Sequence, residues 1–292
     1  MPTKSSTKKS SPKPAAASAS LTSTLDFRRA GMPSADSVLE VRTLTPGAVA
    51  VATKASGLGA KPAPIFRVIR TNEVDGYEEG ALTFGIRAAS ASKKSSKKSS
   101  KKSSKKAGGD SFTGKARKAA KLSISAAPTR AYRDVRTLIN TLPAHQEMVD
   151  MNISTGATSG RVRVEERNVR VRAFIYAASR EDDHDFHLIL GRAPSALPEV
   201  YMTMELSGLP PASAASFTRL KAARDAYKAF FADDLPGTSY DFYDPPIPVL
   251  IEGSLFWDAS HAHGTRPGPQ SLKSRMPVVW EVHPISKITF NP

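Results

Sequence analysis

Histidines and carboxylates recur together at three places in this chain of 292 residues, and their side chains are the ones best suited to chemistry. Five of the six histidines fall in these clusters, which are Asp183, His184, Asp185 and His187; Asp258, His261 and His263; and Glu281 and His283. Imidazole nitrogen and carboxylate oxygen are ligands of Zn²⁺ and similar metals. These residue types therefore suggest a divalent metal ion bound by His187, His261 and His283 with one carboxylate, and one coordination position left open for water or substrate.

The same residues have a simpler interpretation. A histidine beside an aspartate at a strand end commonly forms hydrogen bonds to the loop backbone, and the spacings here match no tight metal motif. Trp257 and Trp280 also have two interpretations, as platforms on which a base or sugar stacks or as core residues at alternating strand positions. Both interpretations stay open at the level of the sequence.

The order of the elements predicts where these side chains lie. Alternating or apolar runs at 162–176, 186–192, 200–209, 249–259 and 278–290 predict five strands, and the stripe within 216–232 predicts a helix between the third and the fourth. This is the order of an OB-like barrel, a mostly β (α+β) fold, and a small α+β sandwich is the alternative. In such a barrel the loops after the first and fourth strands share one mouth. We expect a ligand mouth there, formed by Asp185, His187, Trp257, Asp258, His261, Trp280, Glu281 and His283.

Three blocks of this region resemble a family of uncharacterised bacterial proteins. The blocks are DHDFHLILG (183–191), IEGSLFWDASHAHG (251–264) and WEVHPISKI (280–288). They resemble an Asp-aromatic-His-Leu block, a Gly-x-x-aromatic-aromatic-Asp-x-x-His block and a Glu-x-His-Pro block. The resemblance spans about residues 160–290 and implies a small β-barrel with Asp185, His187, Asp258, His261, Glu281, His283 and Pro284 at the motif positions. It implies no reaction, and the insertion at 266–275 departs from the pattern.

The positive charge is confined to one half of the chain. The net charge is +15, yet residues 1–150 hold 27 basic and 11 acidic side chains, and residues 151–292 hold 15 and 16. A four-residue Lys/Ser repeat spans residues 93–106. We predict a nucleic-acid arm that contacts phosphates without sequence preference. Its residues are Lys93, Lys94, Lys97, Lys98, Lys101, Lys102, Lys105, Lys106, Lys115, Arg117, Lys118 and Lys121. A solvated linker and an anionic membrane surface are the alternatives.

Composition predicts the domain organisation. Residues 1–35 are predicted to be a disordered basic tail, 36–90 a small β-rich segment, and 91–128 a disordered Lys/Ser-rich linker. A short helix is predicted at 129–145, and the OB-like domain at 155–292. The chain has no cysteine, which excludes disulfides and cysteine nucleophiles, and no well-defined enzyme motif. We recognise no signal peptide or membrane span, and expect a cytoplasmic or nucleoid-associated protein.

The sequence thus favours a non-enzymatic binding protein with a basic arm on nucleic acid and a near-neutral domain that recognises a ligand or protein partner at its mouth. No cofactor is required, although a divalent metal fits the histidines. The alternative is a metal-assisted hydrolase or nuclease that uses Asp185 or Glu281 as a base. A third hypothesis is a structural or interaction protein in an assembly.

Overall fold

A computed structural model describes residues 25–47, 65–75, 109–262 and 267–292. The predictions made for residues 1–24, 48–64, 76–108 and 263–266 lie outside the described residues. They include the lysines of the 93–106 repeat and His263.

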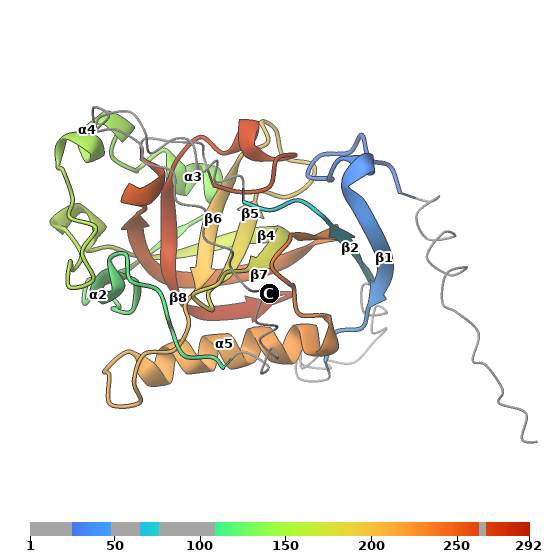
Figure 1. Cartoon of the computed structure of the whole chain (residues 1–292). Coiled ribbons are helices and arrows are strands. Elements are labelled where there is room, and N and C mark those ends of the chain that lie inside the picture. Colours follow the sequence, from blue (N-terminus) through green and yellow to red (C-terminus); the bar gives the residue numbers. More distant parts are fainter. Residues whose placement is uncertain (1–24, 48–64, 76–108, 263–266) are drawn as a thin grey trace, which may run out of the picture.

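The described chain is mostly β, as predicted, and its strands form one mixed sheet of eight strands (Figure 1). The order across the sheet is β1-β2-β7-β8-β6-β5-β4-β3, with a further pairing between β7 and β4. The strands are β1 (Val38–Leu44), β2 (Phe66–Thr71), β3 (Thr129–Tyr132), β4 (Asn168–Arg180), β5 (Phe186–Gly191), β6 (Tyr201–Leu206), β7 (Asp241–Trp257) and β8 (Trp280–Phe290).

The helices are short except for one. They are α2 (Lys118–Lys121), α3 (Val135–Ile139), α4 (His145–Asp150) and α5 (Phe217–Phe231), with 3-10 turns η1 (Ala35–Ser37), η4 (Arg163–Glu165), η5 (Ala232–Asp234), η6 (Ala259–His261) and η7 (Lys273–Arg275). None of the helices in the described ranges has the length and apolar character needed to cross a membrane.

The predicted count of five strands was wrong, because three further strands join the same sheet. β2 pairs antiparallel with the first residues of β7, β1 pairs with β2, and β3 lies parallel to β4. β7 is 17 residues long and begins at Asp241, eight residues before its predicted start. The backbone hydrogen-bonding groups of this extension need partners, and β2 supplies them. The described part of the 36–90 segment is therefore part of the main sheet.

The pairings among the five predicted strands return to their starting point. β4 pairs with β5, β5 with β6, β6 with β8, β8 with β7 and β7 with β4. Helix α5 lies between β6 and β7 in the chain, as predicted, and runs across one end of these strands (Figure 1). Its aromatic stripe buries Tyr227, Phe230 and Phe231, and the Phe230 ring stacks on Phe290 of β8 at 3.9 Å between ring centroids.

The prediction of one helix over 129–145 was wrong. Thr129–Tyr132 is strand β3, and α3 begins only after Asp134, whose side chain accepts a hydrogen bond from the Thr137 N–H. Tyr132, Val135 and Leu138 are buried, as the apolar spacing implied. The spacing identified the buried side chains correctly, but the backbone of residues 129–132 pairs with β4 instead of continuing the helix.

The predicted disordered regions extended too far into the fold. Residues 109–128 belong to the folded part, where Ser111 bridges Leu209 and the Arg117 side chain is buried. Arg117 binds both carboxylate oxygens of Glu165 at 2.7 Å and donates to the Trp257 carbonyl at 3.0 Å. Likewise, Arg29 of the predicted 1–35 tail forms an ion pair with Asp244. A buried guanidinium must be paired, so Arg117 has a structural role and is not part of a solvated arm.

The Arg117–Glu165 pair gives a test of this assignment. Replacing Arg117→Ala leaves Glu165 buried without its counter-charge, and we expect the free energy of unfolding to fall by about 3–5 kcal/mol. Urea unfolding followed by circular dichroism measures it. The control is Lys115→Ala, an exposed residue two positions earlier. Equal stability of the two variants would show that residues 109–128 do not hold the fold together.

Candidate functional site: a buried histidine and carboxylate centre

The strand register brings the candidate residues together from separate elements. His187 of β5 pairs with Glu205 of β6, and Met204 pairs with Val282 of β8. Paired residues point to the same side and neighbours along a strand alternate, so His187, Glu205 and His283 share one face. Glu281 lies two residues before His283 and points to that face as well. Asp258 and His261 reach it from the end of β7 and η6.

The centre contains three groups of donor atoms, and the three predicted histidines lie in three different groups. The groups are Asp75, Glu181 and His187; Asp185, Glu205 and His283; and Asp258, His261 and Glu281. Within each group, one donor atom per residue lies within 4.8 Å of the others. The prediction that His187, His261 and His283 bind one ion together does not match this arrangement.

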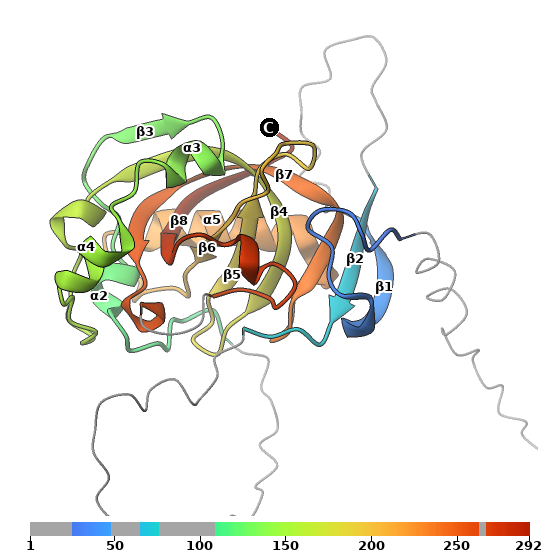
Figure 2. The same ribbon diagram turned by 90° about the horizontal axis from the view of Figure 1, so that it is seen from above.

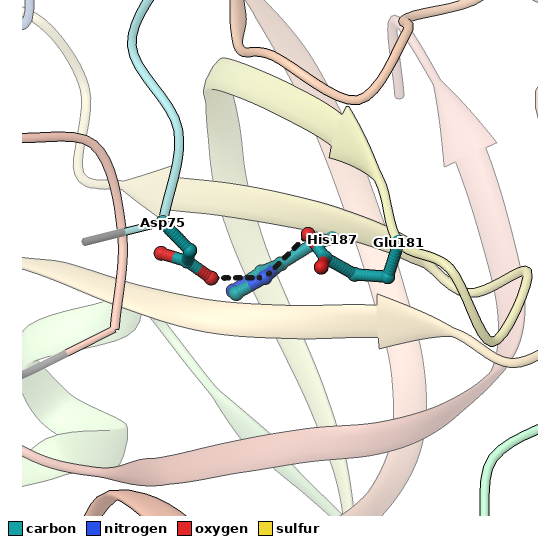
Figure 3. Close-up of side chains that lie close together, drawn as sticks. All are labelled: Asp75, Glu181 and His187. Carbon is teal, nitrogen blue, oxygen red and sulfur yellow. Dashed lines mark ion pairs between the residues drawn. The ribbon is translucent and has the colours of Figure 1, made fainter. Parts of the chain in front are cut away.

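His187 lies beside the carboxylates of Asp75 and Glu181 (Figure 3), and its other ring nitrogen contacts a hydroxyl group. Its Nδ1 is 3.1 Å from Asp75 Oδ2 and 3.6 Å from Glu181 Oε1, and its Nε2 is 3.2 Å from Thr203 Oγ1. Burial alone would lower the pKa of His187, but the charge and hydrogen bond of Asp75 act together with Glu181 and Glu205 and raise the pKa well above the ordinary value. Hydroxyl, imidazole and carboxylate follow the order of a nucleophilic triad. His187 and Thr203 are only 2% and 1% exposed, so this series of contacts is buried in the described structure.

His283 is fully buried between carboxylates. Its Nδ1 is 2.8 Å from Glu205 Oε2 and 3.5 Å from Glu281 Oε2, while its Nε2 is 3.4 Å from Asp185 Oδ2. Despite these short distances, neither ring nitrogen has a hydrogen bond of acceptable geometry. Burial lowers the pKa of His283, and the charge of Glu205 only partly opposes this.

The carboxylates of the centre repel one another. Burial, reinforced by the charges of Glu205 and Asp258, raises the pKa of Glu281 well above its ordinary value. Burial also raises the pKa of Asp185, as does the nearby Asp183 charge. For Glu205, burial would raise the pKa, but the charges of His283 and Lys121 hold it well below the usual range.

Asp258 and His261 form a local ion pair beside this centre. Asp258 Oδ2 contacts His261 Nδ1, and Asp258 Oδ1 accepts a hydrogen bond from the Ser260 N–H at 2.9 Å. Burial would raise the pKa of Asp258, but the His261 hydrogen bond lowers it below the ordinary value. Asp258 thus stays ionised and adds to the negative charge near Glu281.

Lys121 is the cation that faces these acids. Its Nζ is 3.9 Å from Asp183 Oδ2 and 4.0 Å from Glu205 Oε2. Burial lowers its pKa, but the surrounding carboxylates outweigh that effect and keep the ammonium group charged. Sequence reasoning had placed Lys121 in the nucleic-acid arm. The structure places its side chain, which is 15% exposed, against the acidic centre.

The remaining predicted site residues lie elsewhere or are core residues. Trp257 and Trp280 are each 1% exposed and pack edge to face with ring centroids 5.6 Å apart, as the core interpretation expected. His184 is not in the centre; its Nδ1 contacts the Ser111 carbonyl at 2.6 Å. Among the described residues, the predicted mouth therefore consists mainly of buried side chains, with His261 partly exposed.

Sequence reasoning missed Glu205, Asp75 and Glu181 as members of the centre. Glu205 had a detectable signal, because it is a charged residue in the otherwise apolar strand YMTMEL. Asp75 had none, since it lies more than a hundred residues from His187 and approaches it only through the β2–β7 pairing.

Comparison of the chain with protein families, with curated proteins and with solved structures gave no match. The resemblance noted from the sequence blocks therefore stays a prediction.

The role of Lys121 can be tested by matched substitutions on one helix. Lys121→Met removes the charge that faces Asp183 and Glu205, and we expect a loss of about 3–5 kcal/mol in the free energy of unfolding. Lys118→Met makes the same change at an exposed position of α2 and should stay within about 0.5 kcal/mol of the parent. Urea denaturation of the three proteins measures the difference. A Lys121→Met protein as stable as Lys118→Met would mean that the acidic centre does not depend on this ammonium group.

Proposed function

We propose that this protein binds nucleic acid without chemically changing it, through the Lys-rich segment 93–106 attached to a near-neutral folded part. The distribution of charge carries this proposal. The described residues contain 26 Lys and Arg and 25 Asp and Glu, whereas the remaining residues contain 16 and 2. Nearly the whole net charge of +15 thus belongs to segments outside the described fold. Concentrated lysines neutralise phosphates and release the counterions condensed on them, which gives sequence-independent binding.

The folded part contributes little electrostatic attraction of its own. Arg170 and Arg172 lie on an exposed face of β4, but Glu252 of β7 pairs with Arg170 at 2.9 Å. Lys287 of β8 lies 3.7 Å from the same carboxylate. This balance supports the Lys-rich segment, and not the sheet surface, as the main phosphate contact.

The strand pairings support an OB-like barrel within the larger sheet. The ring of pairings β4-β5-β6-β8-β7-β4, with α5 between β6 and β7 in the chain, is the arrangement expected for that fold. OB folds commonly bind oligonucleotides, and this adds support for a nucleic-acid partner. A nucleic-acid partner is also consistent with the proposed nucleoid-associated location.

The alternative of a metal-assisted hydrolase has weaker support. Its proposed residues are buried: Asp185 and His283 are 0% exposed and Glu281 is 1% exposed. A hydrolase must bring a substrate phosphate or carbonyl to the metal-bound water. The described geometry therefore favours binding over catalysis.

The proposal is tested by replacing the eight lysines of residues 93–106 with glutamine in the full chain. If all eight contact phosphates, the slope of log Kd against log salt on duplex DNA should become shallower by about 7. Fluorescence anisotropy with a labelled duplex over a range of NaCl concentrations measures the slope and the affinity.

An arginine version of the same segment is the matched control. It keeps the eight charges and should keep the steep salt dependence, because the attraction is electrostatic. Glutamine and parent chains with the same affinity and the same slope would overturn the proposal. Loss of binding in the arginine version would instead point to a lysine-specific contact.

A further inference from the structure

The buried centre carries more negative charge than its own cations can balance. Apart from His187, which faces two carboxylates of its own, the carboxylates of the centre outnumber its basic groups: Asp183, Asp185, Glu205, Asp258 and Glu281 face Lys121, His261 and His283. If both imidazoles were protonated, two negative charges would still remain, and with neutral imidazoles four would remain. Isolated charge in a low-dielectric interior is costly, so such a centre must take up protons or a bound cation.

Five buried side-chain atoms without hydrogen-bond partners belong to His283 and two of the carboxylates that surround it. Both carboxylate oxygens of Glu281 and both ring nitrogens of His283 have no hydrogen bond among the described residues, although both residues are at least 99% buried. Asp185 Oδ2 has none either. Buried polar atoms are nearly always satisfied in folded proteins, and a bound ion is one of the standard explanations for exceptions.

The distances around His283 Nδ1 are those of neighbouring ligands on one ion. Glu205 Oε2 and Glu281 Oε2 lie 2.8 and 3.5 Å from this nitrogen without forming hydrogen bonds of acceptable geometry to it. Ligands bound at about 2.0–2.2 Å to a tetrahedral or octahedral cation are separated by about 2.8–3.6 Å. Donor atoms that converge without bonding to one another indicate a shared cation.

We propose that His283 Nδ1, Glu205 and Glu281 bind one divalent transition-metal ion. The Nε2–H of the bound ring then donates to Asp185 Oδ2, which lies 3.4 Å away, and Asp185 thereby positions the imidazole. Asp185 is itself held in place, because its Oδ1 accepts a hydrogen bond from the Gly208 N–H at 2.5 Å. A carboxylate on the second ring nitrogen is the usual companion of a histidine ligand, since it fixes the ring and raises its basicity.

The donor set selects the class of metal. One imidazole nitrogen with carboxylate oxygens suits the series from Mn²⁺ to Zn²⁺, whereas Ca²⁺ requires six to eight oxygen ligands and Mg²⁺ prefers oxygen and water. The charge argument agrees in sign. A metal-ligating His283 is neutral, so Lys121 and a protonated His261 leave three negative charges, and a divalent ion offsets two of them. The ion is held within the fold, so we expect it to bind during folding and to stabilise the native state.

The first experiment measures metal in the full-length protein. Cells are grown with added Zn²⁺ or Mn²⁺, and the purified chain is analysed by inductively coupled plasma mass spectrometry. We expect about one ion per chain, and a fall in the melting temperature after treatment with EDTA. Neither measurement needs a variant. A metal-free protein whose melting temperature is unchanged by EDTA would overturn the proposal.

Two isosteric variants then assign the ligands. Glu205→Gln and Glu281→Gln should each reduce metal content at least about tenfold and abolish the response to EDTA. Asp185→Asn removes a positioning residue only, and should weaken metal binding by about 10–100-fold while leaving the ligands in place. Circular dichroism confirms that each variant is folded.

Asp241→Asn is the matched control, because Asp241 is a buried carboxylate that pairs with Arg70 outside the centre. It should keep the metal.

Glu281→Gln distinguishes most clearly between the two ways of neutralising the centre, proton uptake and a bound cation. Without a metal, the change removes an unpaired buried charge and should leave stability equal or higher. With a metal, it should lower the melting temperature to that of the EDTA-treated parent. Retention of metal by Glu281→Gln and Glu205→Gln would mean that the ion binds elsewhere and would overturn the site.

Discussion

Compensation of buried negative charge is the constraint on which the rest of this structure depends. The face shared by β5, β6 and β8 bears Glu205, Glu281 and His283, and the neighbouring turns add Asp185 and Asp258. A sheet face lined in this way cannot pack against apolar residues. The chain must therefore bring polar and cationic groups to it from elsewhere, and the segments outside the five predicted strands provide them.

Two such segments have this role. Residues 109–128 supply Lys121, and they are anchored beside the sheet by the buried Arg117–Glu165 pair. Strand β2 leads directly to Asp75, which contacts His187. The extra strands and the short helix α2 are thus more than additions to a small β domain. Asp75 after β2 and Lys121 of α2 bring charged groups to the polar end of the sheet, while α5 lies across another part of the sheet (Figure 2).

Much of the fold could be predicted because its strands have strong local signals. The runs at 186–192, 200–209 and 278–290 and the stripe at 216–232 became β5, β6, β8 and α5 with small changes at their ends. The weaker elements could not be predicted. Thr129–Tyr132 has little strand character of its own and becomes a strand only because the edge of β4 is available. Residues 109–128 look like a solvated linker in composition, and only the partners of Arg117 and Lys121 show otherwise.

The sequence by itself determined that histidines and carboxylates gather at strand ends and that the surplus of positive charge lies mainly in low-complexity segments. Both facts follow from residue type and spacing along the chain. Only the tertiary structure decided how the histidines are grouped, that Glu205 and Asp75 join them, and that Lys121 faces acids instead of solvent. These outcomes depend on strand register and on contacts between residues far apart in the chain. A shift of one residue in register would turn Glu205 to the opposite face of its strand, and no local pattern in the sequence fixes that register.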